Sequence, residues 1–282
     1  WVAFTNGISA PNTALAVMLM LAMAEPFGMF SQATQESRIL NHQLGKLLPL
    51  LQQRPNRSLD WVVVEPTAAH GLDALELNAV TVAYEDGPPV LNQLSLRAAR
   101  GDFVVVTGPS GSGKSTLLAV LLGFLAPQSG TYRLAAQQTD PVAGLQQVAW
   151  CPQEAYLFDS TLRANLALAR DPAQRPTDDE LLTVLDTVGL TAWLDSSPAG
   201  LDTRLGPSGH FISGGQRQRV AVARALLADA QVVLLDEPTA HLGADEAAEL
   251  LDDLKLALRD SIVVMVTHDQ RFATAGHTLQ LS

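Results

Sequence analysis

The stretch Gly108–Ser115, GPSGSGKS, constrains the fold of this chain more than any other feature. It matches G-x-x-x-x-G-K-[ST], in which glycines let backbone N–H groups turn inward around phosphate oxygens. FVVVT precedes it and TLLAVLLGFL follows it, which predicts a strand, a loop and a helix whose positive dipole end faces the anion. We therefore expect a nucleotide here, with Lys114 on its β- and γ-phosphates and Ser115 on Mg²⁺.

Further apolar runs predict the rest of the sheet. QVAWCPQ, QVVLLDE and SIVVMVTHD are short and valine-rich, as is typical of buried strands, whereas LELNAVTVAY and VLNQLSLRAA read as neighbouring strands. Helical stretches are expected after Gly113, across 160–195, after Ser213 and across 244–258. Apolar strands that alternate with helices indicate an α/β domain around a largely parallel sheet.

An acidic pair follows the run QVVLL. Asp236 and Glu237 should emerge at the carboxyl end of their strand, where such sheets bind ligands. We expect Asp236 to hold magnesium, directly or through water, and Glu237 to orient and deprotonate an attacking water.

A third signal is SGGQRQRVAVARAL, which begins at Ser213. Two glycines between a serine and a glutamine open a helix and present bare N–H groups to an anion. By itself this stretch would be an ordinary helix N-terminus, but its position before the acidic pair gives it more weight.

With these motifs in order, roughly residues 75–282 resemble the ATP-binding cassette (ABC) superfamily. The resemblance implies a P-loop ABC nucleotide-binding domain with an antiparallel β subdomain and a helical subdomain. It also implies that Tyr84 stacks on adenine, that Gln153 is the Q-loop glutamine, and that His268 is the switch histidine on the γ-phosphate. In this family two such domains bind face to face, so that the signature of one chain contacts the nucleotide of the other.

The site implied by the resemblance contains both residues of this chain's own ATP site and residues that act on a partner's ATP. The catalytic residues that the resemblance implies are Glu237, His268, Lys114 and Gln153. The magnesium ligands that it implies are Ser115, Gln153 and Asp236. The ATP contacts are Tyr84, Gly108, Pro109, Ser110, Gly111, Ser112, Gly113, Lys114, Ser115 and Thr116, and in trans Ser213, Gly214, Gly215 and Gln216.

The segment from Ile8 to Phe30 carries Glu25 as its only charge and is long enough for one transmembrane helix, which needs about 20 apolar residues. A buried amphipathic helix is the alternative, although residues 14–24 have no polar face. Glu25 would be either a polar contact in a translocation path or an interfacial residue. We expect residues 1–55 to be the remnant of a truncated membrane domain whose helix continues through 31–51, residues 56–74 to be a linker, and 75–282 to be the ABC domain. Since Trp1 is not a methionine, the simplest interpretation is the C-terminal part of a longer protein.

Composition narrows the functional classes. Hydrophobic residues make up 47% and charged residues 17%, which fits a membrane portion or a buried parallel sheet. The net charge of −11 argues against a nucleic-acid partner. The single cysteine, Cys151, excludes an internal disulfide and is expected to be an ordinary strand residue.

A finer resemblance is to the CydC/CydD-type heterodimeric exporters, carried by WCPQEAYLFDSTLRANLALA, GLDTRLG and LLDEPTAHL. It implies ATP-driven export of a small thiol, cysteine or glutathione, linked to cytochrome bd assembly. It also implies a CydD-type partner and lipid contact in the bacterial inner membrane, with the ATP-binding domain on the cytoplasmic side. An exporter of lipids, peptides or drugs remains an alternative.

Two other classes are disfavoured. A soluble ABC ATPase that works on DNA or ribosomes would need coiled-coil or basic insertions, which residues 117–212 lack. A regulatory cassette without hydrolysis would have lost Glu237, Lys114 or His268.

One position departs from the family pattern. Gly243 stands where the D-loop aspartate belongs, a residue that helps to link the two composite sites. The phosphate chemistry is expected to be intact, while communication between the sites is in doubt.

Overall fold

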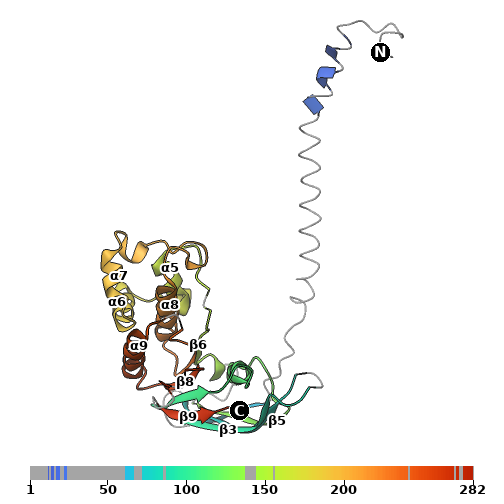
Figure 1. The fold of residues 1–282 in the computed structure, drawn as a ribbon, viewed down its shortest axis with the longest axis vertical. Helices are drawn as coiled ribbons and strands as arrows, with labels where there is room; N and C mark the ends of the chain where they lie inside the picture. Colours follow the sequence, from blue (N-terminus) through green and yellow to red (C-terminus); the bar gives the residue numbers. More distant parts are fainter. Residues whose placement is uncertain are drawn as a thin grey trace. The chain divides into compact units, whose positions relative to one another are not determined.

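The computed structural model describes residues 61–66, 72–84, 87–136, 144–154, 156–240, 242–269, 271–272 and 276–281, together with residues 12, 14–15, 17–19 and 22–23. The chain divides into two compact units, Trp1–Arg57 and Ser58–Ser282, which are described separately (Figure 1).

In the first unit the described residues are helical, and the apolar side chains of Leu15, Met18 and Leu19 are exposed. The rest of the expected span over residues 8–30, including Glu25, and the segment 31–51 lie outside the described residues. Among the residues that are described, no helix combines the length and the apolar character needed to cross a bilayer.

The second unit is built around a five-stranded parallel sheet. Its strand order is β6-β7-β8-β4-β9, and each neighbouring pair is parallel. The strands are β4 (Phe103–Thr107), β6 (Val148–Cys151), β7 (Val232–Asp236), β8 (Ile262–Thr267) and β9 (His277–Gln280). Strands β4, β6, β7 and β8 are the ones predicted from FVVVT, QVAWCPQ, QVVLLDE and SIVVMVTHD, and these predictions are confirmed.

Both faces of this sheet are covered, which explains why its strands are apolar throughout. Successive side chains of a strand point to opposite faces. Val105 of β4 packs in a core with the helices between Leu162 and Ala257, α5 to α9, whereas Val104 and Val106 pack in a second core with α3 (Lys114–Leu121) and the other sheet. Figure 1 shows α5 to α9 gathered on one side of the sheets.

The second sheet has four strands in the order β1-β5-β2-β3. Its strands are β1 (Val62–Pro66), β2 (Leu72–Val82), β3 (Leu91–Ala99) and β5 (Ser129–Ala136). β2 is antiparallel to both of its neighbours, as expected for an antiparallel subdomain, while β1 is parallel to β5.

The structure differs from the sequence prediction over residues 56–74, which were expected to form a linker. Residues Val62–Pro66 form strand β1, β2 begins at Leu72, and the boundary between the units lies at Ser58. The β-branched run beginning at Val62 suits a strand, and a segment distant in sequence completes it. β1 pairs with β5, and the centroids of the Trp61 and Tyr132 rings lie 6.0 Å apart.

The helices fall where the sequence predicts them. They are α3 (Lys114–Leu121), α5 (Leu162–Leu166), α6 (Asp178–Thr187), α7 (Thr191–Ser196), α8 (Gly214–Leu227) and α9 (Ala244–Ala257), with short 3₁₀ turns η1 (Ala167–Ala169), η2 (Pro172–Gln174), η3 (Gly200–Asp202) and η4 (Pro207–Gly209).

Candidate functional site

The glycine-rich loop joins β4 to α3 at the carboxyl end of the parallel sheet. Gly113 is the N-cap of α3 in the left-handed region, with φ 94°, and no side chain caps the helix. A Cβ there would lie 2.8 Å from Leu91 Cδ2, so glycine is required on two grounds. The first N–H groups of α3 have no carbonyl within the helix to bond, and they form a cradle suited to an anion.

Lys114 lies across this loop. Its Nζ donates to the carbonyl oxygens of Gly108, at 2.7 Å, and Pro109, at 2.8 Å. A Cβ at Gly108 would lie 2.7 Å from the Leu281 carbonyl oxygen, so the chain packs closely against the loop. Ser112 Oγ is buried without a hydrogen-bond partner among the described residues.

Glu237 follows the last residue of β7. Its φ of 51° lies in the left-handed region, which is uncommon for a residue with a side chain and is often found at functional sites. Its backbone N–H donates to Val266 O at 2.9 Å, which ties the turn to β8.

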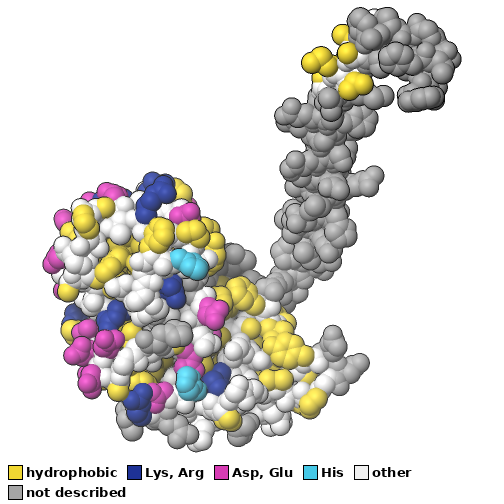
Figure 2. Space-filling model, turned by 45° about the horizontal axis from the view of Figure 1, so that its top comes forward, with side chains coloured by type: hydrophobic (Ala, Val, Ile, Leu, Met, Phe, Trp, Pro, Cys, Tyr) yellow, Lys and Arg dark blue, Asp and Glu magenta, His cyan; other side chains and the backbone are white. Residues whose placement is uncertain are grey.

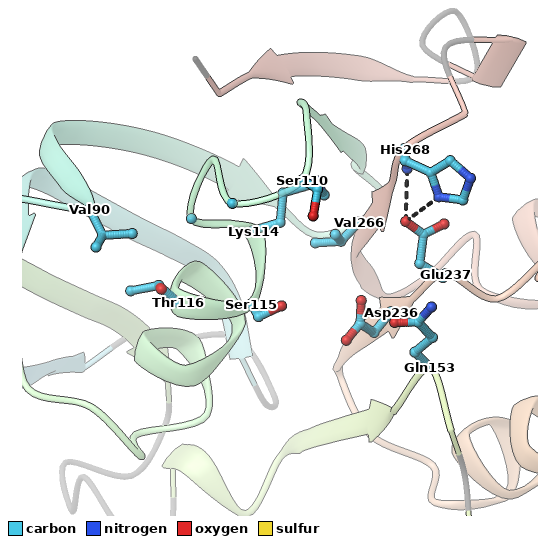
Figure 3. Close-up of a pocket in the computed structure, with 12 residues that line it drawn as sticks. Val90, Ser110, Lys114, Ser115, Thr116, Gln153, Asp236, Glu237, Val266 and His268 are labelled. Atoms are coloured by element: carbon cyan, nitrogen blue, oxygen red, sulfur yellow. Dashed lines mark hydrogen bonds and ion pairs between the residues drawn. The ribbon is translucent and has the colours of Figure 1, made fainter. Parts of the chain in front are cut away.

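The Glu237 carboxylate is held by the residues at the end of β8 (Figure 3). Oε1 accepts from the His268 backbone N–H at 2.8 Å and also lies 2.8 Å from His268 Nδ1. Oε2 accepts from the Thr267 hydroxyl at 3.2 Å. The Glu237 side chain is only 8% exposed and that of His268 is 73% exposed, so a buried carboxylate is joined to a solvent-facing ring.

Asp236 is the last residue of β7. Burial raises the pKa of its carboxyl above the ordinary value, and the negative charge of Glu237 raises it further, while Lys114 lowers it. The acidic pair and the lysine therefore act on one another electrostatically. A cation between them would favour the ionised form of Asp236.

A cavity of about 340 Å³ joins these elements (Figure 3). It is lined by Val90, Ser110, Gly111, Gly113, Lys114, Ser115, Thr116, Gln153, Asp236, Glu237, Val266 and His268. The fold thus brings together residues of the loop, the β6 end, the acidic pair and the β8 end.

Some expected ATP contacts lie beside this cavity without lining it. Gly108, Pro109 and Ser112 belong to the same loop. The Tyr84 hydroxyl is hydrogen-bonded to Thr116 Oγ1 at 3.2 Å, and the tyrosine is 52% exposed. An exposed ring anchored to the first turn of α3 is available for stacking.

The SGGQ stretch does not line this cavity. Ser213 is the N-cap of α8: its Oγ accepts from the Gln216 N–H at 3.1 Å, and its N–H donates to Gln216 Oε1 at 2.9 Å. Gly214, together with Gln153, lines a separate cavity of about 540 Å³. Gly215 lies in the first turn of the same helix.

Oxygen donors that suit magnesium meet in the first cavity. The Asp236 carboxylate, the Ser115 hydroxyl and the Gln153 amide all line it. Mg²⁺ is usually bound by one or two carboxylates together with substrate phosphates, so this donor set fits the ion.

Sequence reasoning missed Thr267, Val90 and Val266. Thr267 is fully buried and donates to Glu237. A signal was present, because a threonine ends the otherwise apolar run IVVMVT directly before His268.

These features define an ATP-binding domain, and comparison with known proteins gives its family. The family model described as ABC transporter matches residues 91–240. The chain therefore belongs to the ABC transporter family, and it carries the ATP-binding domain with which that family couples ATP hydrolysis to transport.

Individual relatives are named as ATP-binding/permease proteins. Over 277 residues the chain is 33% identical to the glutathione/L-cysteine transport system ATP-binding/permease protein CydC of Escherichia coli (strain K12), covering 94% of this chain and 46% of that protein. It is 30% identical to the mycobactin import ATP-binding/permease protein IrtB of Mycolicibacterium smegmatis, covering 98% of this chain and 47% of that protein. The chain thus spans about half the length of these relatives.

The fold agrees with a solved structure. A bacterial Atm1-family ABC exporter with ATP bound superimposes with a TM-score of 0.71 at 24% identity, covering 96% of this chain and 46% of that chain. The expected ABC nucleotide-binding fold is confirmed.

Proposed function

We propose that this chain binds and hydrolyses ATP as the motor subunit of a membrane exporter, with Glu237 as the residue that orients and deprotonates the attacking water. The observation that carries the proposal is the buried Glu237 carboxylate, held at both oxygens in the same cavity as Lys114.

Phosphate binding falls to the loop. The uncapped N–H groups at the start of α3 face the phosphates, and the Lys114 ammonium exchanges its two carbonyl partners for phosphate oxygens. Tyr84 stacks on the adenine from outside the loop. The remaining loop residues, Gly108–Thr116, enclose the phosphate chain.

The residues that directly follow β7 and β8 take part in hydrolysis. Glu237 accepts the proton of the attacking water, His268 contacts the γ-phosphate, and Gln153 closes the cavity from the β6 side. Ser115, Gln153 and Asp236 would hold Mg²⁺, which when bound neutralises charge on the phosphate oxygens.

The capped start of α8 serves a second chain. Ser213, Gly214, Gly215 and Gln216 lie outside the cavity, so we assign their ATP contacts to a nucleotide held by the partner half-transporter. In the CydC-type assignment this partner is CydD-type. The complex then lies in a bacterial inner membrane, in contact with lipid, with this domain on the cytoplasmic side.

For the transported substrate we propose a thiol reductant, cysteine or glutathione, in the role linked to cytochrome bd assembly. Support comes from the stretch WCPQEAYLFDSTLRANLALA and from similarity to a relative named for glutathione and L-cysteine transport. A relative named for mycobactin import matches almost as well, which makes an exporter-type transporter of another substrate the second candidate. Nucleic acid is not proposed as a partner. On the face drawn in Figure 2 the described Lys and Arg side chains are scattered among acidic ones and form no stripe.

Hydrolysis is tested with Glu237→Gln in the complete transporter, assembled with its partner. Removing a general base lowers turnover by about 10²-fold or more, so steady-state ATPase activity should fall by at least that factor while ATP binding is retained. Unchanged turnover would remove Glu237 from this role.

The substrate is tested by uptake of labelled cysteine and glutathione into inverted membrane vesicles. Uptake should require ATP and be lost in Glu237→Gln. ATP-dependent uptake of neither thiol by vesicles that hydrolyse ATP normally would overturn the thiol assignment and leave the ATPase assignment standing.

A further inference from the structure

The orientation of the Glu237 carboxylate is not fixed by its own side chain. The terminal torsion of a glutamate is broad, and its ordinary rotamers leave the carboxylate free to turn. A base that must meet one water in one direction therefore depends on donors from its surroundings. In this chain these donors are His268 at Oε1 and Thr267 at Oε2.

Thr267 has a hydroxyl whose direction can be worked out from its partners. The Asp269 backbone N–H donates to Thr267 Oγ1 at 3.0 Å, so that oxygen is already an acceptor. An ionised carboxylate only accepts hydrogen bonds. The hydroxyl hydrogen is therefore left to point at Glu237 Oε2, 3.2 Å away.

The position of this hydroxyl is rigid. Thr267 is 0% exposed and β-branched, which restricts its first side-chain torsion. It ends β8 directly opposite Thr107, the last residue of β4 before the glycine-rich loop. The donor is thus fixed to the same strand ends that support the phosphate loop.

We propose that Thr267 is a positioning residue for hydrolysis: its hydroxyl holds Glu237 Oε2, while His268 holds Oε1, and so fixes the plane of the carboxylate that receives the proton. Thr267 does not line the cavity, so it acts through Glu237 and not by contact with ATP. The inference rests on the proposed role of Glu237.

The test compares two substitutions of the same buried side chain in the complete transporter. Thr267→Val keeps the shape and removes the hydroxyl, which is both the donor to Glu237 and the acceptor of the Asp269 N–H, whereas Thr267→Ser keeps the hydroxyl and removes a methyl group. Loss of one hydrogen bond to a charged group corresponds to a factor of about 10 or more, so kcat should fall about 10-fold in Thr267→Val with the KM for ATP changed less than about 2-fold. Thr267→Ser should stay within about 2-fold of the original kcat.

A double-mutant cycle separates positioning from folding. In the Glu237→Gln background Thr267→Val should have almost no further effect on kcat, because the residue it positions is gone. The midpoints of thermal unfolding, measured for all variants, show whether each variant folds. If Thr267→Val does not fold, Thr267→Ala against Thr267→Ser asks the same question.

Three results would overturn the inference. The kcat of Thr267→Val could equal that of the original protein, or Thr267→Ser could lower kcat as much as Thr267→Val does. Thr267→Val could also lower kcat as much in the Glu237→Gln variant as in the original protein. Failure of the proposed function gives a different result, since Glu237→Gln would then hydrolyse ATP at the original rate.

Discussion

Helices α3 and α8 both have glycine-rich starts, but α3 begins after GPSGSG whereas α8 begins within SGG, and their first turns are bonded differently. α3 has a left-handed glycine as its N-cap and no side-chain cap. α8 has a complete capping box between Ser213 and Gln216. The first helix end opens into the cavity that holds Lys114, and the second lies outside it. Two similar sequence patterns thus give one helix end without a side-chain cap, which we call open, and one whose serine side chain is already bonded within its own chain, which we call closed.

The difference suggests a division of work. The backbone N–H groups of the open helix end can bind phosphate without breaking an existing hydrogen bond. At the closed end the Gln216 N–H must be shared or released by the serine before it contacts a ligand, because Ser213 Oγ already accepts it. We expect ligand contact at the closed helix end to depend on the approach of another chain, so that substitutions at the two helix ends have different effects.

Of the substitutions that compare the helix ends, the one at the open end of α3 is expected to have the largest effect. Lys114→Ala removes a charged donor from the phosphates, and hydrogen bonds to charged groups contribute about 1.5–3 kcal/mol. ATP affinity at this chain's site should fall about 10- to 100-fold, measured by calorimetric titration. Unaltered affinity would show that the loop does not bind the nucleotide as we describe.

At the closed helix end, Ser213→Ala should lower the ATPase turnover of the assembled transporter but leave the ATP affinity of this chain's own loop unchanged. The loss of an N-cap also costs about 1 kcal/mol of stability. Thr177→Ala is the matched control, because Thr177 forms the same capping box with Glu180 in α6, away from the cavity. Thr177→Ala should show a similar stability loss with normal turnover. Equal turnover losses in both variants would mean that helix capping alone explains the effect.

Gly243 begins a third helix, α9, at a position where the backbone does not require a glycine. Its φ is −64°, it is the N-cap of α9, and a Cβ would meet no atom within 4 Å. Gly243→Asp should alter the rate or cooperativity of hydrolysis more than ATP affinity, and should stabilise the domain by a few tenths of a kcal/mol through capping, about the difference between Asp and Gly at this position. Gly243→Asn caps equally well without the charge and is the control. A large affinity change with unchanged kinetics would show that the loop is misassigned.

The smallest effect is expected from the charge of the capping box in α6. This box contains the Glu180 carboxylate, whereas the box in α8 contains the neutral Gln216 amide. Hydrogen bonds from Thr177 and Arg170 lower the pKa of Glu180 to about 2 from 4.5. A depressed pKa means that this box stabilises the fold fully above pH 4.5 and loses that contribution as the pH falls toward 2. The difference in thermal midpoint between the original protein and Glu180→Gln should therefore shrink between about pH 5 and pH 3. A difference that stays constant over this range would show that the charge of Glu180 is unimportant.

The sequence predicted most of the ATP-binding domain, because its signals are local. Successive strand residues such as Val104 and Val105 point to opposite faces of the sheet and are both apolar. The loop pattern places glycines where left-handed backbone occurs, as at Gly113. The Thr267 contact was not predictable in this way, since it joins residues that are far apart in sequence. Strand β1 was missed because its β-branched run is short and lies between proline-containing stretches that resemble a linker.

We propose that the open end of α3 binds this chain's ATP and that the closed end of α8 contacts the partner's ATP. Photolabelling of the assembled transporter with an azido-ATP analogue, read separately on each chain, tests it directly. Lys114→Ala should remove the label from this chain, while Ser213→Ala should leave this chain labelled and reduce retention of nucleotide on the partner. Loss of label from this chain in Ser213→Ala, with labelling of the partner unchanged, would contradict the assignment of the two helix ends.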